Sequence, residues 1–282
     1  MSPVHDSDAR ASAHAATTTE DTTAWWATGV SDIEPGVIRL RGYPVEELIG
    51  QASFVDVVWL LTRGDLPAPD QAALLEHALV AAVDHGPQAP SIAAARMAVT
   101  CGVGLNTAIA SGVGLLGDVH GGAGQQCLAL LRRLAEADDL VVAVADVLAD
   151  HRARAMHVPG FGHRFHPLDP RRDPLVGAVE SAVAAGTVEG RHLAAALELE
   201  RQLAAGRSRP VPMNIDGATA IIYGELGFDP ELARGLFCLS RSVGILAHAW
   251  EQRAEGGRIK GPLPPPLLPD YTGPAPRSVP GA

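Results

Sequence analysis

Apolar side chains recur every three or four residues through most of this chain, and this period constrains its fold more than any other feature. Residues 70–84, 139–154 and 189–205 each follow the pattern. The residues expected on the three buried faces are Leu75, Leu79, Ala82 and Val83, then Leu140, Val144, Val147, Leu148 and His151, then Leu193, Leu197 and Leu203. Such a period indicates amphipathic helices, so we predict about ten helices and a mainly α fold.

Residues typical of helix ends mark the limits of two further helices. Ser53 and Asp56 form an S-x-x-D capping box before an apolar run, which Gly64 ends. Asp138 or Asp139 can cap the helix of residues 139–154, and Asp229 is the predicted N-cap of a helix that runs to Glu255.

Few segments carry a strand signal, and the two ends of the chain have unusual compositions. Val37–Leu40 is the one expected hairpin arm. Residues 1–23 are predicted to form a disordered tail, and Gly261–Ala282 holds eight of the 22 prolines, which excludes a helix there. The 282 residues are enough for about two domains. Because no long Gly/Ser linker separates them, we expect the two domains to be interleaved.

Charge and composition exclude several classes of protein. The net charge of −10 and the 4% aromatic content argue against binding of nucleic acid or of anionic lipid. The three cysteines, Cys101, Cys127 and Cys238, fit neither a zinc site nor a disulfide framework. With no signal-peptide pattern and no apolar run of membrane-spanning length, the sequence favours a cytoplasmic protein.

The segment Gly117–Gly124 places His120 immediately before two glycines and between two apolar helical stretches. Glycines allow a ligand to approach the backbone closely, and N–H groups at a helix start can bind an anion. Taken alone, however, the segment favours a tight helix–helix turn with a solvent-facing histidine.

The segment His157–Arg171 is rich in proline and glycine and is predicted to form an irregular loop. Its Arg164 and Arg171 are forked donors suited to carboxylates or phosphates. A possible metal-binding set in this segment consists of His157, His163, His166 and Asp169. Their spacing matches no usual zinc pattern, so we expect no metal.

Two charged residues near the C-terminal end of the chain are further candidates. Asp216 lies just before the helical run Thr219–Leu226 and, taken alone, is interpreted as an N-cap. Arg241, His248 and Gln252 share one helical face among apolar residues. A buried arginine there needs a counter-charge, either a bound anionic substrate or a salt bridge.

Taken together and in this order, these segments resemble the citrate synthase and citryl-CoA lyase superfamily from about Thr28 to Gly273. The segments that carry the resemblance are Thr28–Ile33, Arg41–Leu48, Phe54–Pro67, Asp84–Gly86, HGGA at 120–123, PGFGHRFHPLDPR at 159–171, NIDGA at 214–218 and SRSVGILAHAWEQ at 240–252. The family fold is a large helical domain with a smaller one inserted. The resemblance therefore implies a small domain of residues 125–225 within a large domain of residues 24–124 and 226–282.

The resemblance also implies roles for individual residues. His120 matches the histidine that steadies the enol, His163 the histidine that acts on the carbonyl or hydroxyl oxygen, and Asp216 the carboxylate that moves the α-proton. The residues matched to substrate carboxylate binding are His85, Arg171 and Arg241. Those expected to bind coenzyme A are Pro159, Gly160, Phe161, Gly162, Arg164, Arg258 and Lys260, of which Arg258 or Lys260 replaces an arginine that a neighbouring subunit usually donates.

The chemistry explains why these residue types are needed. Removal of a weakly acidic C–H proton needs a placed carboxylate, and the developing enolate oxygen needs a preorganised donor such as a neutral imidazole. The short length and the Asp216–Gly217 pair resemble the citryl-CoA lyase branch, which cleaves citryl-CoA to acetyl-CoA and oxaloacetate. The expected partners are an acyl-CoA and a small di- or tricarboxylate, with no metal or redox cofactor, in a homodimer or higher oligomer.

Three alternatives remain open at this point. The first is a citrate synthase-like condensing enzyme, which also hydrolyses the thioester. The second is a module that binds coenzyme A without turnover. The third is a metal-dependent hydrolase that uses His157, His163, His166 and Asp169.

Overall fold

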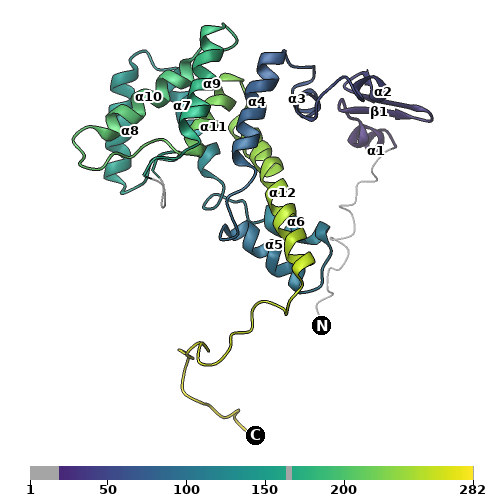
Figure 1. Ribbon diagram of the computed structural model, residues 1–282, viewed down its shortest axis with the longest axis vertical. Helices are drawn as coiled ribbons and strands as arrows, with labels where there is room; N and C mark the ends of the chain where they lie inside the picture. Colours follow the sequence, from purple (N-terminus) through teal and green to yellow (C-terminus); the bar gives the residue numbers. More distant parts are fainter. Residues whose placement is uncertain (1–18, 163–166, 282) are drawn as a thin grey trace, which may run out of the picture. The chain divides into compact units, whose positions relative to one another are not determined.

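The computed structural model describes residues 19–162 and 167–281 of the chain (Figure 1). This part is mainly helical, as predicted, with twelve α-helices and one small sheet. It divides after Ala72 into two compact units. None of the described helices is both long and apolar enough to cross a membrane.

The first unit contains a three-stranded antiparallel sheet and short helices. In chain order its elements are α1 (Thr19–Trp26), β1 (Ser31–Glu34), β2 (Val37–Leu40), β3 (Tyr43–Pro44), α2 (Val45–Leu48) and α3 (Phe54–Arg63). The predicted arm Val37–Leu40 is β2, the central strand, which pairs with both neighbours. The predicted disordered tail extended to residue 23, but α1 begins at Thr19.

The predicted capping box at the start of α3 is confirmed. The hydroxyl of Ser53 accepts from the N–H of Asp56, and the Asp56 carboxylate accepts from the N–H of Ser53. Gly64 ends the helix in the left-handed conformation, with φ of 98°, which a glycine adopts without steric cost.

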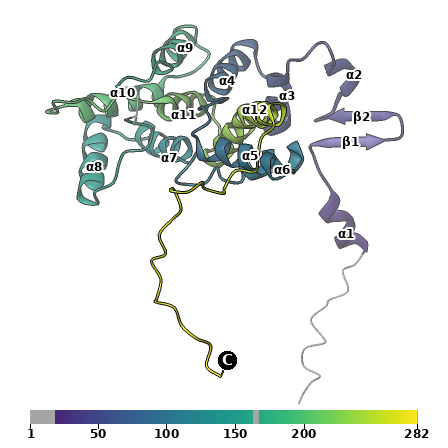
Figure 2. The ribbon, with the colours of Figure 1, turned by 60° about the horizontal axis from the view of Figure 1, so that its bottom comes forward.

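The second unit contains the remaining helices. They are α4 (Pro69–Ala82, whose first turn belongs to the first unit), α5 (Pro90–Thr100), α6 (Leu105–Val113), α7 (Ala123–Ala135), α8 (Leu140–Ala153), α9 (Arg172–Ala184), α10 (Arg191–Ala204), α11 (Ile215–Glu225) and α12 (Pro230–Glu255). Figure 2 shows the second unit from another side. The predicted small domain of residues 125–225 lies wholly inside this unit, so the boundary at Ala72 does not test it.

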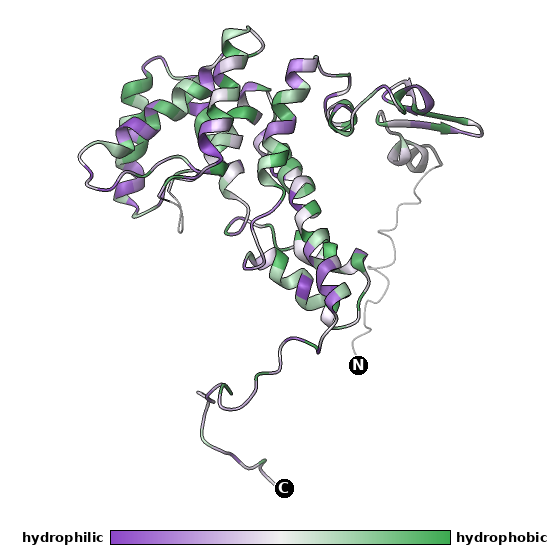
Figure 3. Ribbon diagram, in the orientation of Figure 1, coloured by the Kyte–Doolittle hydropathy of each residue, from purple (hydrophilic) through white to green (hydrophobic). Residues whose placement is uncertain are grey.

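Two groups of helices form the cores of the second unit. Helices α5, α6 and α12 pack around a cluster of small and branched residues, namely Ala89, Ile92, Ala95, Ala108, Ile245 and Ala249. Helix α11 packs on α7, α9 and α10, and it is buried along almost its whole length. Helices α8 and α10 carry both hydrophilic and apolar residues (Figure 3).

Some details of helix burial and capping differ from the sequence prediction. Leu79, Val83 and Leu197 are only half-buried, whereas Leu74 and Leu199 are buried. The period predicts an apolar stripe, but the neighbouring helices decide where its centre lies.

The predicted N-cap residues of α8 and α12 are both confirmed. Asp139 caps α8 through a bond from the N–H of Val142. Asp229 occupies the N-cap position of α12 without a side-chain capping bond, and its carboxylate accepts from Arg132 at 2.7 Å.

Candidate active site

Three motifs that lie far apart in the sequence meet around the start of α11. The HGGA segment leads into α7, and α7 packs against α11 more extensively than any other pair of described helices. A Cβ atom added to Gly124 in the first turn of α7 would lie 3.6 Å from a carboxylate oxygen of Asp216. The loop that contains Pro159–Gly162 passes the same point. The sequence prediction that these segments form one site therefore agrees with the packing.

Backbone and side-chain hydrogen bonds join this loop to the segment before α11. Phe161 pairs with Met213 in an antiparallel bridge, and the N–H of Gly162 donates to the carbonyl of Pro212 at 2.7 Å. Asn214 donates its backbone N–H to the carbonyl of Gly160 at 3.0 Å and its side-chain amide to that of Gly162 at 2.6 Å. Asn214 therefore fixes the position of the loop relative to α11.

Two glycines allow this close approach. A Cβ on Gly217 would lie 2.5 Å from the carbonyl oxygen of Gly160, and a Cβ on Gly160 would lie 2.6 Å from the sulfur of Cys127. Gly160 also has a φ of +83°, a conformation in which other residues are strained. The glycines of the PGFG and NIDG motifs are thus needed for packing.

Asp216 lies in the first turn of α11, and the interpretation as an N-cap is wrong. Asn214 is the cap, since its side-chain oxygen accepts from the N–H groups of Asp216 and Gly217. This leaves the Asp216 carboxylate without a capping role. Burial raises its pKa, although the positive charges of Arg241 and Arg171 act in the opposite direction. A carboxyl group with a raised pKa can both give and take a proton near neutral pH.

His120 is half-buried and held by the start of α5, so it is not the solvent-facing histidine of a simple turn. The backbone N–H of Ser91 donates to Nε2 of His120 at 3.2 Å, and the Ser91 hydroxyl oxygen lies 2.9 Å from the same nitrogen. Because a backbone N–H is always a donor, Nε2 must be the unprotonated nitrogen, and in the neutral ring Nδ1 carries the hydrogen. Burial and the charge of Arg241 lower the pKa of His120, which favours this neutral donor.

Arg241 is a buried cation on α12, with 5% of its surface exposed. Its Nε donates to the carbonyl of Ala82 at 2.8 Å, and the guanidinium carbon lies 4.9 Å from the ring centre of Phe237. Among the described residues no carboxylate forms an ion pair with it; Asp216 and Asp84 act only as more distant negative charges. A buried guanidinium without an ion-pair partner favours the binding of an anion beside it.

Asp169 joins Arg171 to the start of α11. The Asp169 carboxylate accepts from Nε and Nη2 of Arg171 at 2.9 and 2.8 Å, and from the N–H of Ile215 at 3.1 Å. Burial opposes ionisation of Asp169, but the bonds from Arg171 and Ile215 lower its pKa to about 2. Arg171 is thereby held beside Asp216 as a fixed positive charge.

The structure describes most of the other predicted site residues. His85 is exposed in the loop after α4, directly before the left-handed Gly86. Arg258 and Lys260 are exposed after the end of α12, and the backbone N–H of Lys260 donates to the hydroxyl of Thr100 at 3.0 Å. His163 and Arg164 lie outside the described residues.

The sequence predictions missed three residues that shape the site. Ser91 orients His120, Asn214 caps α11, and Asp169 holds Arg171. The Pro90–Ser91 pair at a helix start and the Asn two positions before Asp216 were available signals. The sequence interpretation gives Asp169 only a possible role as a metal ligand. The described residues contain no group of three or more histidines, cysteines or acidic residues placed to hold a metal. His163 and His166 of that set lie outside the described residues.

Sequence comparisons relate the chain to citrate synthases. The family model for the C-terminal domain of citrate synthase matches residues 19–77 and 67–262. A citrate synthase of Haloferax volcanii is 29% identical over 220 residues, which are 77% of this chain and 55% of that protein. One of Acidithiobacillus ferridurans is 31% identical over 151 residues, 52% of this chain and 38% of that protein. The chain thus spans about half or less of these relatives.

Solved structures show the same fold. Citryl-CoA lyase from Hydrogenobacter thermophilus matches with a TM-score of 0.80 and 29% identity, over 90% of this chain and 97% of that chain. ATP citrate lyase from Methanothrix soehngenii, in complex with citrate and coenzyme A, matches with 0.77 and 21%, over 92% of this chain and 45% of the other. Citrate synthase from Thermoplasma acidophilum, with carboxymethyl coenzyme A and oxaloacetate, matches with 0.69 and 25%, over 81% and 59%.

The sequence and structural matches agree with the meeting of the HGGA, PGFG and NIDG segments at one point. The chain belongs to the citrate synthase and citryl-CoA lyase superfamily.

Proposed function

We propose that this protein is a citryl-CoA lyase-type enzyme, which cleaves the carbon–carbon bond of citryl-CoA to acetyl-CoA and oxaloacetate or forms it in reverse. The observation that carries the proposal is that the Asp216 carboxylate lies close to Gly124 in the first turn of α7, directly after the segment that contains His120. His120 offers a fixed neutral Nδ1–H donor, and Asp216 is a carboxyl group whose pKa is raised by burial. This pair fits chemistry through the enol of a thioester.

The steps of cleavage follow from these groups. His163 takes the hydroxyl proton of citryl-CoA, and the electron pair of the breaking carbon–carbon bond forms the enolate of acetyl-CoA. Nδ1–H of His120 donates to the enolate oxygen, and Asp216 gives its proton to the carbon. Arg241 and Arg171 attract the substrate carboxylates, which is how a net acidic protein gathers the positive charge that it needs. Condensation uses the same groups in reverse.

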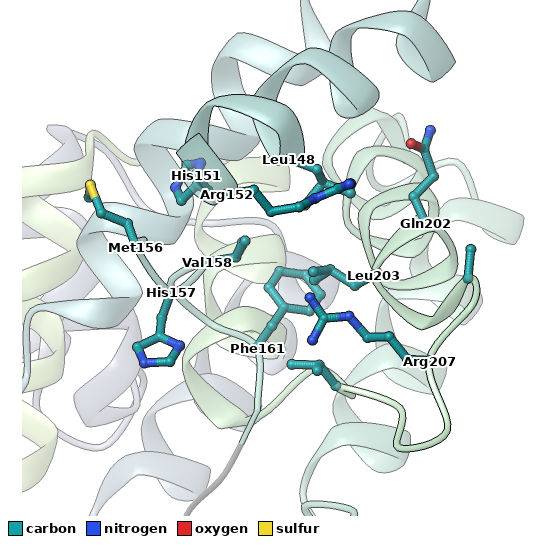
Figure 4. Close-up of a pocket in the computed structure, with 12 residues that line it drawn as sticks. Leu148, His151, Arg152, Met156, His157, Val158, Phe161, Gln202, Leu203 and Arg207 are labelled. Carbon is teal, nitrogen blue, oxygen red and sulfur yellow. The ribbon is translucent and has the colours of Figure 1, made fainter. Parts of the chain in front are cut away.

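A cavity beside the PGFG loop supports binding of the nucleotide end of coenzyme A. Its volume is about 320 Å³ (Figure 4). Val158, Phe161 and Leu203 lie at its centre, with Arg152, Arg207 and His157 around them. An apolar centre suits adenine, and the two arginines, which have no ion-pair partner among the described residues, suit phosphates.

This cavity makes a testable contribution to affinity. Arg152→Ala and Arg207→Ala are each expected to weaken coenzyme A binding about fivefold to tenfold, since each removes a charged hydrogen-bond donor. Arg201→Ala is the matched control, because Arg201 is exposed and paired with Glu198. Calorimetry with coenzyme A and dephospho-coenzyme A shows which phosphate each arginine contacts. Equal coenzyme A affinities of all variants would show that this cavity does not bind coenzyme A.

A homodimer belongs to the proposal as well. Helix α12 exposes Leu239, Val243, Leu246 and Trp250 along one face, with exposed fractions of 39–59%. Such an apolar stripe is typical of a helix-packing interface. Helix α12 ends at Glu255, about 21 Å along its axis from Arg241 at 1.5 Å per residue. Arg258 and Lys260 follow this end, so they are better placed to act on the site of a second copy. We expect Val243→Glu to reduce the mass measured by light scattering to that of one chain. A single-chain mass for the unchanged protein would contradict the dimer.

Product analysis separates lyase from synthase. Purified protein is incubated with citryl-CoA; release of acetyl-CoA and oxaloacetate identifies a lyase, and release of free coenzyme A and citrate identifies a synthase. The relatives found by sequence are named citrate synthases, which keeps the condensing enzyme as the second candidate. Asp216→Asn should abolish turnover but retain coenzyme A binding, with Asp229→Asn as an exposed control. No reaction with citryl-CoA, or with acetyl-CoA and a keto acid, would refute both candidates.

The free thiols fit a reducing compartment, so we propose a cytoplasmic location.

A further inference from the structure

The chain segment that carries His85 is attached to one face of α12 by four contacts. Residues 240, 241, 244 and 248 of the helix each bind a residue between Leu79 and Asp84. The contacts are Ser240 Oγ to the carbonyl of Leu79 at 2.5 Å, Arg241 Nε to that of Ala82 at 2.8 Å, Gly244 N to that of Val83 at 3.1 Å, and His248 Nε2 to Oδ1 of Asp84 at 3.2 Å. The path of this segment is therefore set by α12.

The packing is closest at Gly244. A Cβ at this position would lie 2.3 Å from the carbonyl oxygen of Val83 and 2.9 Å from a carboxylate oxygen of Asp84. Since the backbone of the segment touches the helix here, the next contact along it, between His248 and Asp84, is the last before His85.

His248 has a restricted environment. Its side chain is 19% exposed, its Nδ1 is buried without a hydrogen-bond partner among the described residues, and the nearest acidic oxygen to Nδ1, from Glu251, is 3.8 Å away. In the described part of the chain, the hydrogen bond of this ring is thus the one from Nε2 to Asp84.

Asp84 passes this constraint on to His85. Its second carboxylate oxygen accepts from the N–H of Gly86 at 3.1 Å. The carboxylate thus binds His248 through one oxygen and the residue after His85 through the other. The bonds from Gly86, His248 and His85 outweigh burial and lower the pKa of Asp84, which keeps it an anion at neutral pH.

We propose that His248 is a positioning residue, which acts through Asp84 to hold His85 in the orientation that binds the keto-acid part of the substrate. The inference rests on the proposed function, because it takes from it the role of His85. Beyond that role, it assigns a task to His248 and to Asp84, which otherwise lie outside the catalytic group.

The decisive comparison is between His248→Gln and His248→Asn. The amide nitrogen of Gln lies at about the reach of Nε2, whereas that of Asn lies near the position of Nδ1. We expect His248→Asn and His248→Ala to weaken oxaloacetate binding about tenfold, and His248→Gln to restore it to within about twofold of the unchanged protein. Coenzyme A affinity, measured on the same samples by calorimetry, should stay within about twofold in all three.

Two controls separate positioning from a loss of structure. Glu251→Gln changes the residue on the other side of the ring and is expected to leave oxaloacetate affinity unchanged. Hydrogen exchange of residues 83–89, measured without ligand, should be faster in His248→Asn and His248→Ala and unchanged in His248→Gln.

The outcomes distinguish the two proposals. If oxaloacetate and coenzyme A binding fall equally in His248→Asn, or if His248→Gln behaves like His248→Ala, the positioning role is wrong. If the unchanged protein binds no oxaloacetate and does not act on citryl-CoA, the proposed function fails, and so does the assigned task of His85. Exchange of residues 83–89 would still report whether His248 holds Asp84.

Discussion

The backbone N–H of Ser91 donates to Nε2 of His120 over 3.2 Å, and this bond decides which ring nitrogen carries the hydrogen. Ser91 is the second residue of α5, where backbone N–H groups have no partner inside the helix. The imidazole thus satisfies one of these groups, and in return its Nδ1–H is available for a ligand. A structural need of the helix and a chemical need of the site are met by one contact.

This bond makes a prediction for the state of His120. At pH 7 the ring should be neutral with the hydrogen on Nδ1, because burial and Arg241 lower its pKa from the usual value and Ser91 requires an acceptor at Nε2. Nitrogen chemical shifts from ¹H–¹⁵N correlation spectra report the tautomer. Ser91→Ala removes the hydroxyl but keeps the N–H, so the tautomer should persist in that variant. A hydrogen on Nε2, or a charged ring at pH 7, would contradict the assignment.

Asp216 should show a conflict between activity and stability. Because its folded pKa is raised, the two states bind protons equally below the unfolded pKa, and stability falls as pH rises through the raised value. Asp216→Asn removes this cost, so its melting temperature at pH 7 should be higher by a few degrees. The turnover rate should fall at least about a thousandfold.

Differential scanning calorimetry between pH 3 and pH 8 checks this prediction. The stability difference between Asp216→Asn and the unchanged protein should vanish at the acid end of the range, where both carry a neutral group. An Asp216→Asn protein less stable than the unchanged one at pH 7 would show that the burial cost is not the dominant effect.

Local signals in the sequence predicted several features of the fold correctly. The capping box of Ser53 and Asp56 and the end of α12 at Glu255 both follow from residues within one helical turn of the feature. The family motifs placed His120 and Asp216 in one site, and the packing of α7 on α11 agrees.

The features that the sequence did not predict depend on contacts between residues far apart in the chain. Ser91 and His120 are 29 residues apart, and Asp84 and His248 are much farther apart along the chain. The local sequence offers both Asn214 and Asp216 as caps of α11, because both residue types cap helices and they lie two positions apart. Only the path of the backbone decides between them.

The pair of Asp169 and Arg171 should dominate stability in acid. The pKa of Asp169 is lowered to about 2, so its contribution is present above the usual aspartate pKa and is lost as pH falls from about 4 to about 2. Asp169→Asn leaves a partly buried guanidinium without its partner and should cost about 2–4 kcal/mol at pH 7. Urea unfolding at several pH values measures both effects. Asp150→Asn, which affects an exposed ion pair with Arg154, should leave stability nearly unchanged. Similar losses in the two variants would contradict the role of the buried pair.

The three thiols should react at very different rates. Cys101 is exposed, Cys238 is half-buried, and Cys127 is fully buried beneath Gly160, where burial raises its pKa far above the usual value. Because the thiolate is the reactive form, a disulfide reagent should label Cys101 first and Cys127 only after unfolding. Cys101→Ser should remove the fast phase. Rapid reaction of Cys127 in the folded protein would mean that the loop over it opens readily.

Two glycines of α12 offer a matched test of how closely this helix packs. A Cβ on Gly235 meets no atom within 4 Å, so Gly235→Ala should stabilise the protein by about 0.5–1 kcal/mol through helix propensity. A Cβ on Gly244 would lie 2.3 Å from the backbone of Val83, so Gly244→Ala must push the segment before His85 away from the helix. We expect a loss of about 1–3 kcal/mol in Gly244→Ala, together with weaker oxaloacetate binding, whereas Gly235→Ala should keep its affinity. Thermal unfolding and calorimetry on both variants test this, and equal stability of the two would show that α12 does not determine the path of residues 79–86.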